Sequence, residues 1–136
     1  VGSEMCIRDR SDTVVAADGK ILGKPKSHEE AYEMIRRLAG RSHQVYTGVC
    51  LVKKGPEGEA DTVVSFYDET DVNVSPMTEK EIREYADSEE PMDKAGSYAV
   101  QGFFARYIDG LKGSYANVMG LPVHLVYQEL KKLGAL

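Results

Sequence analysis

Asp12 is the first residue of the sequence whose type and setting suggest chemistry. It directly precedes the apolar, β-branched run TVVAA. A carboxylate at a strand end could coordinate a hard cation or activate a water molecule, because such cations prefer oxygen ligands. A solvated acid at the end of a strand is the simpler alternative. Asp12 is therefore a candidate site residue on its position alone.

Lys24 is the second candidate, and it stands in a Gly-Lys-Pro turn. Gly23 removes steric bulk on one side and Pro25 restricts the backbone on the other, so the ammonium group could be held toward a phosphate. A surface lysine beside a turn is the alternative. The segment is not a P-loop, because the pattern GxxxxGK[ST] is absent from the sequence.

Two later segments combine glycine with polar side chains. In DKAGSYAVQG (93–102), Asp93 and Lys94 could form a charged turn, and Gln101 carries an amide that donates and accepts together, as reading a base edge requires. The alternative for Gln101 is a polar residue on an edge strand. In GSYANVMGLP (113–122), a tight loop could present backbone amides to an anion, although a plain connection explains it equally well.

The first half of the chain predicts strands with one helix between them. Residues 12–17 predict a strand that starts at Asp12 and turns back through Asp18-Gly19. Ser27 and Glu30 form a capping box for a helix that ends at Gly40. Residues 43–55 and 62–74 predict two strands joined by a solvated loop. The helix has one apolar face, formed by Ala31, Met34, Ile35 and Leu38.

The second half predicts a second capping box, Thr78 with Glu81, for a helix through about Tyr85, and a loop over 87–92. Residues 97–115 predict a hairpin that turns at Asp109-Gly110. A last helix runs from Pro122 to Gly134, with Leu125, Val126 and Leu130 facing inward. Interleaved helices and hairpins favour an α/β fold with a mixed, twisted sheet flanked by helices.

The composition limits the classes of protein that remain. A chain of 136 residues with 42% hydrophobic residues favours one domain. The net charge of -5 argues against general binding to nucleic acid. Two cysteines without CxxC spacing, and three histidines without triad or metal-cluster spacing, indicate no zinc site or disulfide framework. Without an apolar run of about 20 residues or a signal peptide, we expect a soluble, cytoplasmic protein with no membrane partner.

Taken in order, five segments are more specific than any one of them. The succession SDTVV, ILGKP, LAGRSHQVYTGV, EEPMDKAGSYAVQG and GSYANVMGLP resembles the Maf family of nucleoside triphosphate pyrophosphatases, from about Ser11 to the C-terminus. The resemblance implies a fold related to the inosine triphosphate pyrophosphatases. It also implies cleavage between the α- and β-phosphates, a divalent cation (Mg²⁺, with Mn²⁺ as an option), a homodimer and a role in clearing surplus or non-standard nucleotides.

The resemblance also implies roles for single residues. Asp12 matches the acid taken as the general base beside the metal, and Thr13 matches a position linked to substrate choice. Lys24 matches a lysine that contacts the triphosphate, and Lys94 belongs to the D-K-A-G turn at the substrate. Gln101 looks like the branch that acts on dTTP and UTP, whereas the branch acting on 7-methyl-GTP typically has glutamate there. An amide suits the mixed edge of uracil or thymine, and a carboxylate suits the adjacent donors of guanine.

The family pattern is not complete in this sequence. Members usually begin with a strand and an S-x-[ST]-P-R-R segment that binds phosphate, and neither is present. Residues 1–10, VGSEMCIRDR, resemble a translated adapter, so we expect a non-native leader followed by the C-terminal portion of a Maf-like domain in 11–136, without its N-terminal strand-loop-helix. The alternative to an enzyme is therefore a non-catalytic nucleotide-binding or regulatory module, or an inactive fragment.

Overall fold

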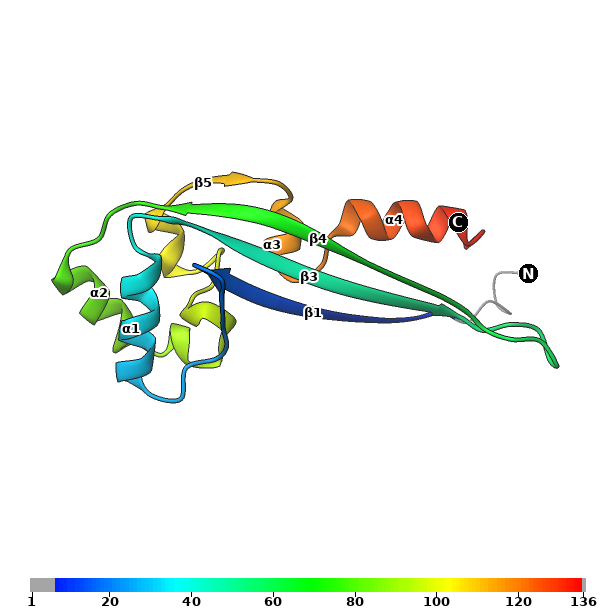
Figure 1. Ribbon diagram of the computed structural model, residues 1–136, viewed down its shortest axis with the longest axis horizontal. Coiled ribbons are helices and arrows are strands. Elements are labelled where there is room, and N and C mark those ends of the chain that lie inside the picture. The colour runs from blue at the N-terminus through cyan, green and yellow to red at the C-terminus, as the bar shows by residue number, and fades with distance from the viewer. Residues whose placement is uncertain (1–6, 136) are drawn as a thin grey trace.

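The computed structural model describes residues 7–135, which form one twisted sheet, a group of short helices at one end of it and a further helix beside its long strands (Figure 1). Residues 1–6 of the expected leader, including Cys6, and Leu136 lie outside the described residues. The strands are β1 (Ile7–Ala17), β2 (Lys20–Leu22), β3 (Ser42–Lys53), β4 (Thr62–Val74) and β5 (Ile108–Lys112).

The sheet of the described chain is antiparallel throughout. Its strand order is β2-β1-β3-β4-β5, and each neighbouring pair runs in opposite directions. The prediction of a mixed sheet is therefore wrong. Asp18 and Gly19, both with positive φ, turn β1 back into β2 as predicted. After α1, strand β3 pairs with the other edge of β1 and runs antiparallel to it. No two neighbouring strands of the described chain are therefore parallel.

Strand β1 is longer than predicted. It begins at Ile7, so Asp12 lies in the middle of the strand, and the prediction that Asp12 stands at the strand's entrance is wrong. Residues 7–10 of the expected leader pair with the far end of β3. Backbone pairing makes few demands on side chains, which allows these residues to continue the ladder. Because β2 pairs only with Val15–Ala17, residues 7–14 leave the outer edge of β1 without a neighbouring strand in the described chain.

Two helices begin where the sequence predicts them. Helix α1 (His28–Leu38) begins after Ser27, whose hydroxyl accepts the Glu30 N–H, and α2 (Glu79–Ala86) begins with the complete capping box of Thr78 and Glu81. The remaining helices are α3 (Tyr115–Val118), α4 (Val123–Lys132) and the 3₁₀ helices η2 (Glu90–Asp93), η3 (Ala95–Ser97) and η4 (Phe103–Tyr107). Helix η2 occupies part of the segment predicted as a loop over 87–92.

The predicted hairpin over 97–115 does not form. Residues 98–107 are turns and the helix η4, and Asp109 and Gly110 lie inside β5 rather than in a turn. Gly110 pairs with Asn73 of β4, so β5 finds its partner in a distant strand. The prediction fails because the Asp-Gly dipeptide reports only a local preference, which pairing with β4 outweighs.

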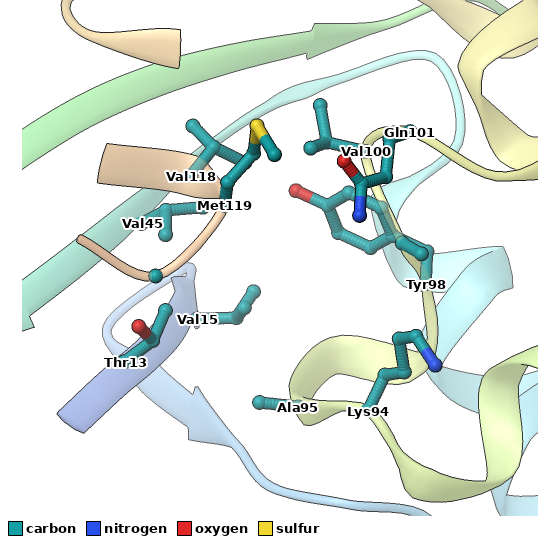
Figure 2. Close-up of a pocket in the computed structure, with 12 residues that line it drawn as sticks. Thr13, Val15, Val45, Lys94, Ala95, Tyr98, Val100, Gln101, Val118 and Met119 are labelled. Carbon is teal, nitrogen blue, oxygen red and sulfur yellow. The ribbon is translucent and has the colours of Figure 1, made fainter. Parts of the chain in front are cut away.

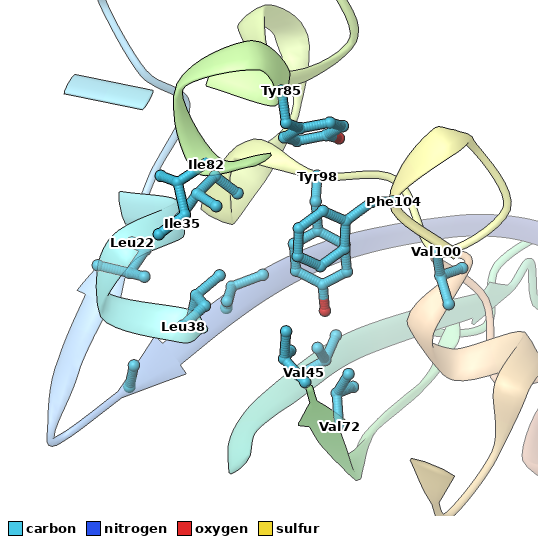
Figure 3. Close-up of a cluster of buried hydrophobic side chains, with 13 residues drawn as sticks. Leu22, Ile35, Leu38, Val45, Val72, Ile82, Tyr85, Tyr98, Val100 and Phe104 are labelled. Atoms are coloured by element: carbon cyan, nitrogen blue, oxygen red, sulfur yellow. The ribbon is translucent and has the colours of Figure 1, made fainter. Parts of the chain in front are cut away.

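The core joins one face of the sheet to the short helices (Figure 3). Val15, Val45 and Val72 come from the three central strands and are at most 4% exposed. Ile35 and Leu38 of α1 and Ile82 and Tyr85 of α2 pack against this face together with Phe104, which is fully buried. The helical apolar face predicted for α1 is confirmed, because Ala31, Ile35 and Leu38 are buried as predicted.

Helix α4 contributes less to the core than predicted. It starts after Pro122 as expected, but Leu125, Val126 and Leu130 are only half-buried, and the helix has no fully buried residue. It runs beside the long β3–β4 ribbon (Figure 1), where the ammonium group of Lys53 donates to the Leu133 carbonyl at 2.7 Å. These three side chains are partly buried, as the prediction of an inward-facing side implies, but they do not join the core. A two-stranded ribbon covers less of a helix surface than a packed core does.

Candidate functional site

A pocket of about 190 Å³ opens between β1, β3, the segment 94–101 and the loop after α3 (Figure 2). Of the five site residues predicted from the sequence, Thr13, Lys94 and Gln101 line it. This volume lies below the roughly 300–1,000 Å³ typical of sites that enclose a drug-sized ligand. The pocket can therefore enclose a small ring but not a whole nucleoside triphosphate. Its other walls are formed by Val15, Val45, Ala95, Tyr98, Ala99, Val100, Val118, Met119 and Gly120.

Asp12 and Thr13 lie on opposite faces of the sheet, because successive side chains of a strand point to opposite sides. Thr13 shares the face of the buried Val15 and lines the pocket. Asp12 is exposed and pairs across the sheet with Gly48, where it borders a shallow hollow with Arg10. The structure therefore does not bring Asp12 into the pocket, and a ligand reaches both residues only by crossing the free edge of β1.

The Gly-Lys-Pro turn is attached to the pocket through its glycine. The Gly23 carbonyl accepts the backbone N–H of Gly96 at 3.1 Å, which joins two segments more than 70 residues apart in the chain. Lys24 itself is exposed and close enough to Asp93 to help lower the pKa of that carboxyl group. The fold therefore brings this turn next to the D-K-A-G turn, but Lys24 does not line the pocket.

Lys94 contributes mainly its alkyl chain to the pocket. Its ammonium group donates to the Asp93 carboxylate at 2.7 Å, and Figure 2 shows that group directed away from Thr13. This hydrogen bond is the largest cause of the lowered pKa of Asp93. Both side chains are substantially exposed, so the ion pair contributes little to stability. An incoming phosphate can compete with Asp93 for Lys94.

Gln101 is exposed at the pocket's rim, and Glu90 holds its loop in place. The Glu90 carboxylate accepts the backbone N–H groups of Phe103 at 2.8 Å and Phe104 at 3.3 Å, as well as the Tyr85 hydroxyl. Gly102 lies so close to Glu90 that a Cβ there would stand 1.9 Å from the carboxylate. The sequence analysis missed Glu90, although an acid next to Pro91 before the D-K-A-G turn was a visible signal.

Asn117, also missed, ties the GSYANVMGLP segment to the sheet. Its side-chain amide donates to the Val45 carbonyl at 3.1 Å and to the Thr70 hydroxyl at 2.8 Å, and the residue is fully buried. Its backbone carbonyl accepts the Thr47 hydroxyl at 2.9 Å. Buried Asn117 thus anchors this segment and places Val118, Met119 and Gly120 at the pocket. The segment's predicted alternatives, an anion-binding loop and a plain connection, both stay open.

Gly96 holds three of the site's segments together. Its φ is +71°, and a Cβ at this position would stand 2.8 Å from the Val15 side chain. We expect Gly96→Ala to lower the free energy of unfolding by about 3 kcal/mol, which combines the cost of a left-handed backbone with that of overpacking. Chemical denaturation of the variant measures this loss.

Gly19→Ala is the matched control for this prediction. Gly19 has a similar φ of +76° but no atom within 4 Å of its would-be Cβ. It should therefore show only the backbone cost of about 1–2 kcal/mol. Equal losses in the two variants would contradict the role given to the contact between Gly96 and Val15.

His43 and Tyr98 form a buried polar pair behind the pocket. The His43 Nε2 atom lies 2.6 Å from the Tyr98 hydroxyl, and its Nδ1 atom has no hydrogen-bond partner among the described residues. Burial lowers the pKa of His43 to about 4 and raises that of Tyr98. His43 is therefore neutral at pH 7. His28 is exposed, and its Nδ1 atom lies 2.8 Å from the Ala86 carbonyl oxygen.

The lowered pKa of His43 predicts a loss of stability in mild acid. The unfolded chain takes up a proton near pH 6.5, whereas the folded protein does so only near pH 4, so stability falls as the pH falls between these values. From pH 7 to pH 5 the loss is about 2 kcal/mol. Urea denaturation of His43→Gln should show a pH dependence weaker by this amount, while substitution of the exposed His124 by glutamine should leave it unchanged. Parallel pH profiles for the parent and His43→Gln would contradict the prediction.

Within residues 7–135, no group of three His, Cys, Asp or Glu side chains could hold a metal ion. No helix within this range has the length and apolar character needed to cross a membrane. The thiol of Cys50 is free and half-buried.

Comparison with known proteins agrees with the order of motifs around this pocket. The sequence model of the Maf-like protein family matches residues 10–133. The chain therefore belongs to the Maf family.

Its relatives carry a more particular description. The chain is 53% identical over 127 residues to a dTTP/UTP pyrophosphatase of Agathobacter rectalis, an alignment that covers 91% of this chain and 60% of the relative. It is 48% identical to one of Lachnoclostridium phytofermentans (91% and 62% covered) and 47% identical to one of Bacteroides thetaiotaomicron (90% and 61%). The chain thus spans about 60% of the length of the curated relatives it matches.

Proposed function

We propose that the protein hydrolyses dTTP and UTP to the nucleoside monophosphate and pyrophosphate, as the names of its relatives describe for them. One observation carries the proposal. The fold brings Thr13, Lys94 and Gln101, from segments far apart in the chain, to the walls of one pocket that can enclose a pyrimidine ring. The role in clearing nucleotides and the homodimer, both implied by the family, and the cytoplasmic location expected from the composition are parts of the same proposal.

The pocket and the turns around it suggest how a nucleotide would lie. The amide of Gln101 at the rim can meet both a carbonyl and the ring N–H of uracil or thymine. The triphosphate extends out of the pocket, where Lys94 and Lys24 lie near Asp93 and can neutralise phosphate charge. Asp12, across the free edge of β1, would accept the proton of the attacking water.

The cation implied by the family is compatible with this arrangement. Mg²⁺ is commonly held by one or two carboxylates together with substrate phosphates. Asp12 can supply one such carboxylate because it is exposed, and the described residues need not form a complete cage. Bound there, Mg²⁺ would neutralise charge on the phosphates and favour ionisation of water.

A substrate panel tests the proposed function. The protein is incubated with dTTP, UTP, CTP and 7-methyl-GTP in the presence of Mg²⁺, and released pyrophosphate is measured. We expect faster release from dTTP and UTP than from 7-methyl-GTP, because the Gln101 amide offers a donor and an acceptor to uracil or thymine, whereas a carboxylate would suit the two adjacent donors of guanine. CTP, whose edge an amide can also match, is the pyrimidine comparison. Preference for 7-methyl-GTP would contradict the role of Gln101, and release of single phosphates would contradict the proposed bond cleavage.

One observation favours a second candidate function, that of a non-catalytic nucleotide-binding module. Asp12 lies on the face of the sheet opposite to the pocket, so the described chain can hold a nucleotide in the pocket without its phosphates reaching the Asp12 carboxylate. Calorimetry with dTTP separates the candidates. Binding with pyrophosphate release supports the enzyme, and binding alone supports the module.

A further inference from the structure

Four hydroxyl and amide groups form a continuous hydrogen-bonded chain behind the pocket. The Thr13 Oγ1 atom lies 3.0 Å from the Thr47 Oγ1 atom, and Thr47 Oγ1 lies 2.9 Å from the Asn117 carbonyl oxygen. Asn117 in turn donates from its side chain to the Thr70 hydroxyl, which donates to the Ser114 carbonyl at 3.0 Å. Thr47, Thr70 and Asn117 are fully buried, and Thr13 alone among these side chains lines the pocket.

The direction of each bond in this chain follows from counting protons. A backbone carbonyl only accepts, so the 2.9 Å contact between Thr47 and Asn117 requires the single hydroxyl proton of Thr47. Thr47 therefore has no proton left for Thr13, and the bond between the two threonines is donated by Thr13. What the Thr13 hydroxyl then offers to a molecule in the pocket is a lone pair.

The acceptor role of the Thr13 hydroxyl matters because much of the pocket wall around it is apolar. Figure 2 shows Thr13 and Gln101 on opposite sides of the pocket, whose walls also carry apolar residues such as Val15 and Val118. An amide can turn to present a donor or an acceptor, whereas the Thr13 hydroxyl is held in one role by a buried neighbour. Selection among nucleotides therefore depends on Thr13 and not on the Gln101 amide alone.

We propose that Thr47 is a positioning residue that keeps Thr13 a hydrogen-bond acceptor, so that the pocket selects a pyrimidine nucleotide presenting a donor at this point. The inference rests on the proposed function. A ring N–H of uracil or thymine and a hydroxyl of the sugar share this chemistry. If the donor is the ring N–H, a ring nitrogen with a lone pair, as in cytosine, meets the lone pair of Thr13 and is rejected; if it is the sugar hydroxyl, a nucleotide without that hydroxyl is rejected.

Calorimetric titration with product nucleotides tests the proposal without turnover. UMP is compared with CMP, which replaces the ring N–H by a lone pair, and with 3′-deoxy-UMP, which lacks a sugar hydroxyl. We expect the parent chain to bind UMP at least tenfold more tightly than one of these analogues, and the analogue identifies the donor. In Thr47→Val, which keeps the shape but frees the Thr13 proton, this ratio should fall to about threefold or less.

Three further variants separate positioning from general damage. Thr47→Ser keeps the hydroxyl and should retain the parent's ratio. Thr13→Val should lose the ratio as Thr47→Val does, and the double variant should lose no more than either single one, because both changes act on the same bond. A ratio unchanged by Thr47→Val, or lost equally in Thr47→Ser, overturns the inference while UMP binding still supports the proposed function. Absence of UMP binding to the parent chain overturns both.

Discussion

Asp12→Asn is expected to lower the rate of pyrophosphate release from dTTP and UTP by about 10² to 10⁴, the usual contribution of a general base. Asparagine keeps the size of the side chain but cannot accept the proton of the attacking water at neutral pH. Binding of UMP should be nearly unchanged, because Asp12 does not line the pocket that we propose for the base. Pyrophosphate release under saturating nucleotide, together with calorimetry, measures the two effects separately.

Asp9→Asn is the matched control for Asp12. Asp9 is an exposed acid of the same strand, and it lies three residues away, so it has no place in the proposed site. Asp9→Asn removes the same charge but leaves the proposed general base, Asp12, in place. The rate of pyrophosphate release should therefore stay within about twofold of the parent's, as expected for a screened surface charge. Full turnover by Asp12→Asn would contradict the assignment of the base. Equal losses in both variants would indicate a general effect of charge on β1.

Phe104→Ala is expected to lower the free energy of unfolding by about 4 kcal/mol, within the range measured for buried phenylalanines. Phe104 is fully buried, and its ring centroid lies 4.8 Å from that of Tyr98 and 5.0 Å from that of Tyr85. Removal of the Phe104 ring leaves a cavity next to Tyr98, which belongs to the core and also lines the pocket. Denaturation by urea, with the midpoint and slope both recorded, measures the loss.

Phe103→Ala provides the comparison. Phe103 is the adjacent residue of the same helix, is 50% exposed and contacts Arg106 across its ring face. Its truncation removes little buried area, so a loss of about 1 kcal/mol is expected. The difference of about 3 kcal/mol between neighbours tests whether η4 is placed by its buried phenylalanine. Losses within experimental error of each other would refute that account.

Much of the fold's local structure follows from short sequence signals. Ser27 and Thr78 each cap a helix, and Asp18-Gly19 turns β1 into β2, because each signal depends on bonds within a few residues. The same type of signal failed at Asp109-Gly110, where the chain pairs with β4 instead. Local preference decided the structure only where no distant partner offered more hydrogen bonds.

The site shows the same division. The resemblance carried by the order of motifs was sufficient to nominate Thr13, Lys94 and Gln101, which the fold brings to one pocket. Their supporting residues, Glu90, Thr47 and Asn117, were not predicted, since each acts through contacts that span from 13 to 72 residues of chain. Contacts between residues this far apart in the chain follow no regular spacing, so the sequence pattern does not predict them.

The sequence by itself determined the family, the candidate residues and the helix caps, because these depend on residue identity and near neighbours. Only the tertiary structure decided that the sheet is antiparallel, that Asp12 and Thr13 serve opposite faces, and that a buried threonine sets the polarity of the pocket. The physical reason is that strand pairing and the direction of a buried hydrogen bond are settled between segments, by which donor meets which acceptor once the chain has closed on itself.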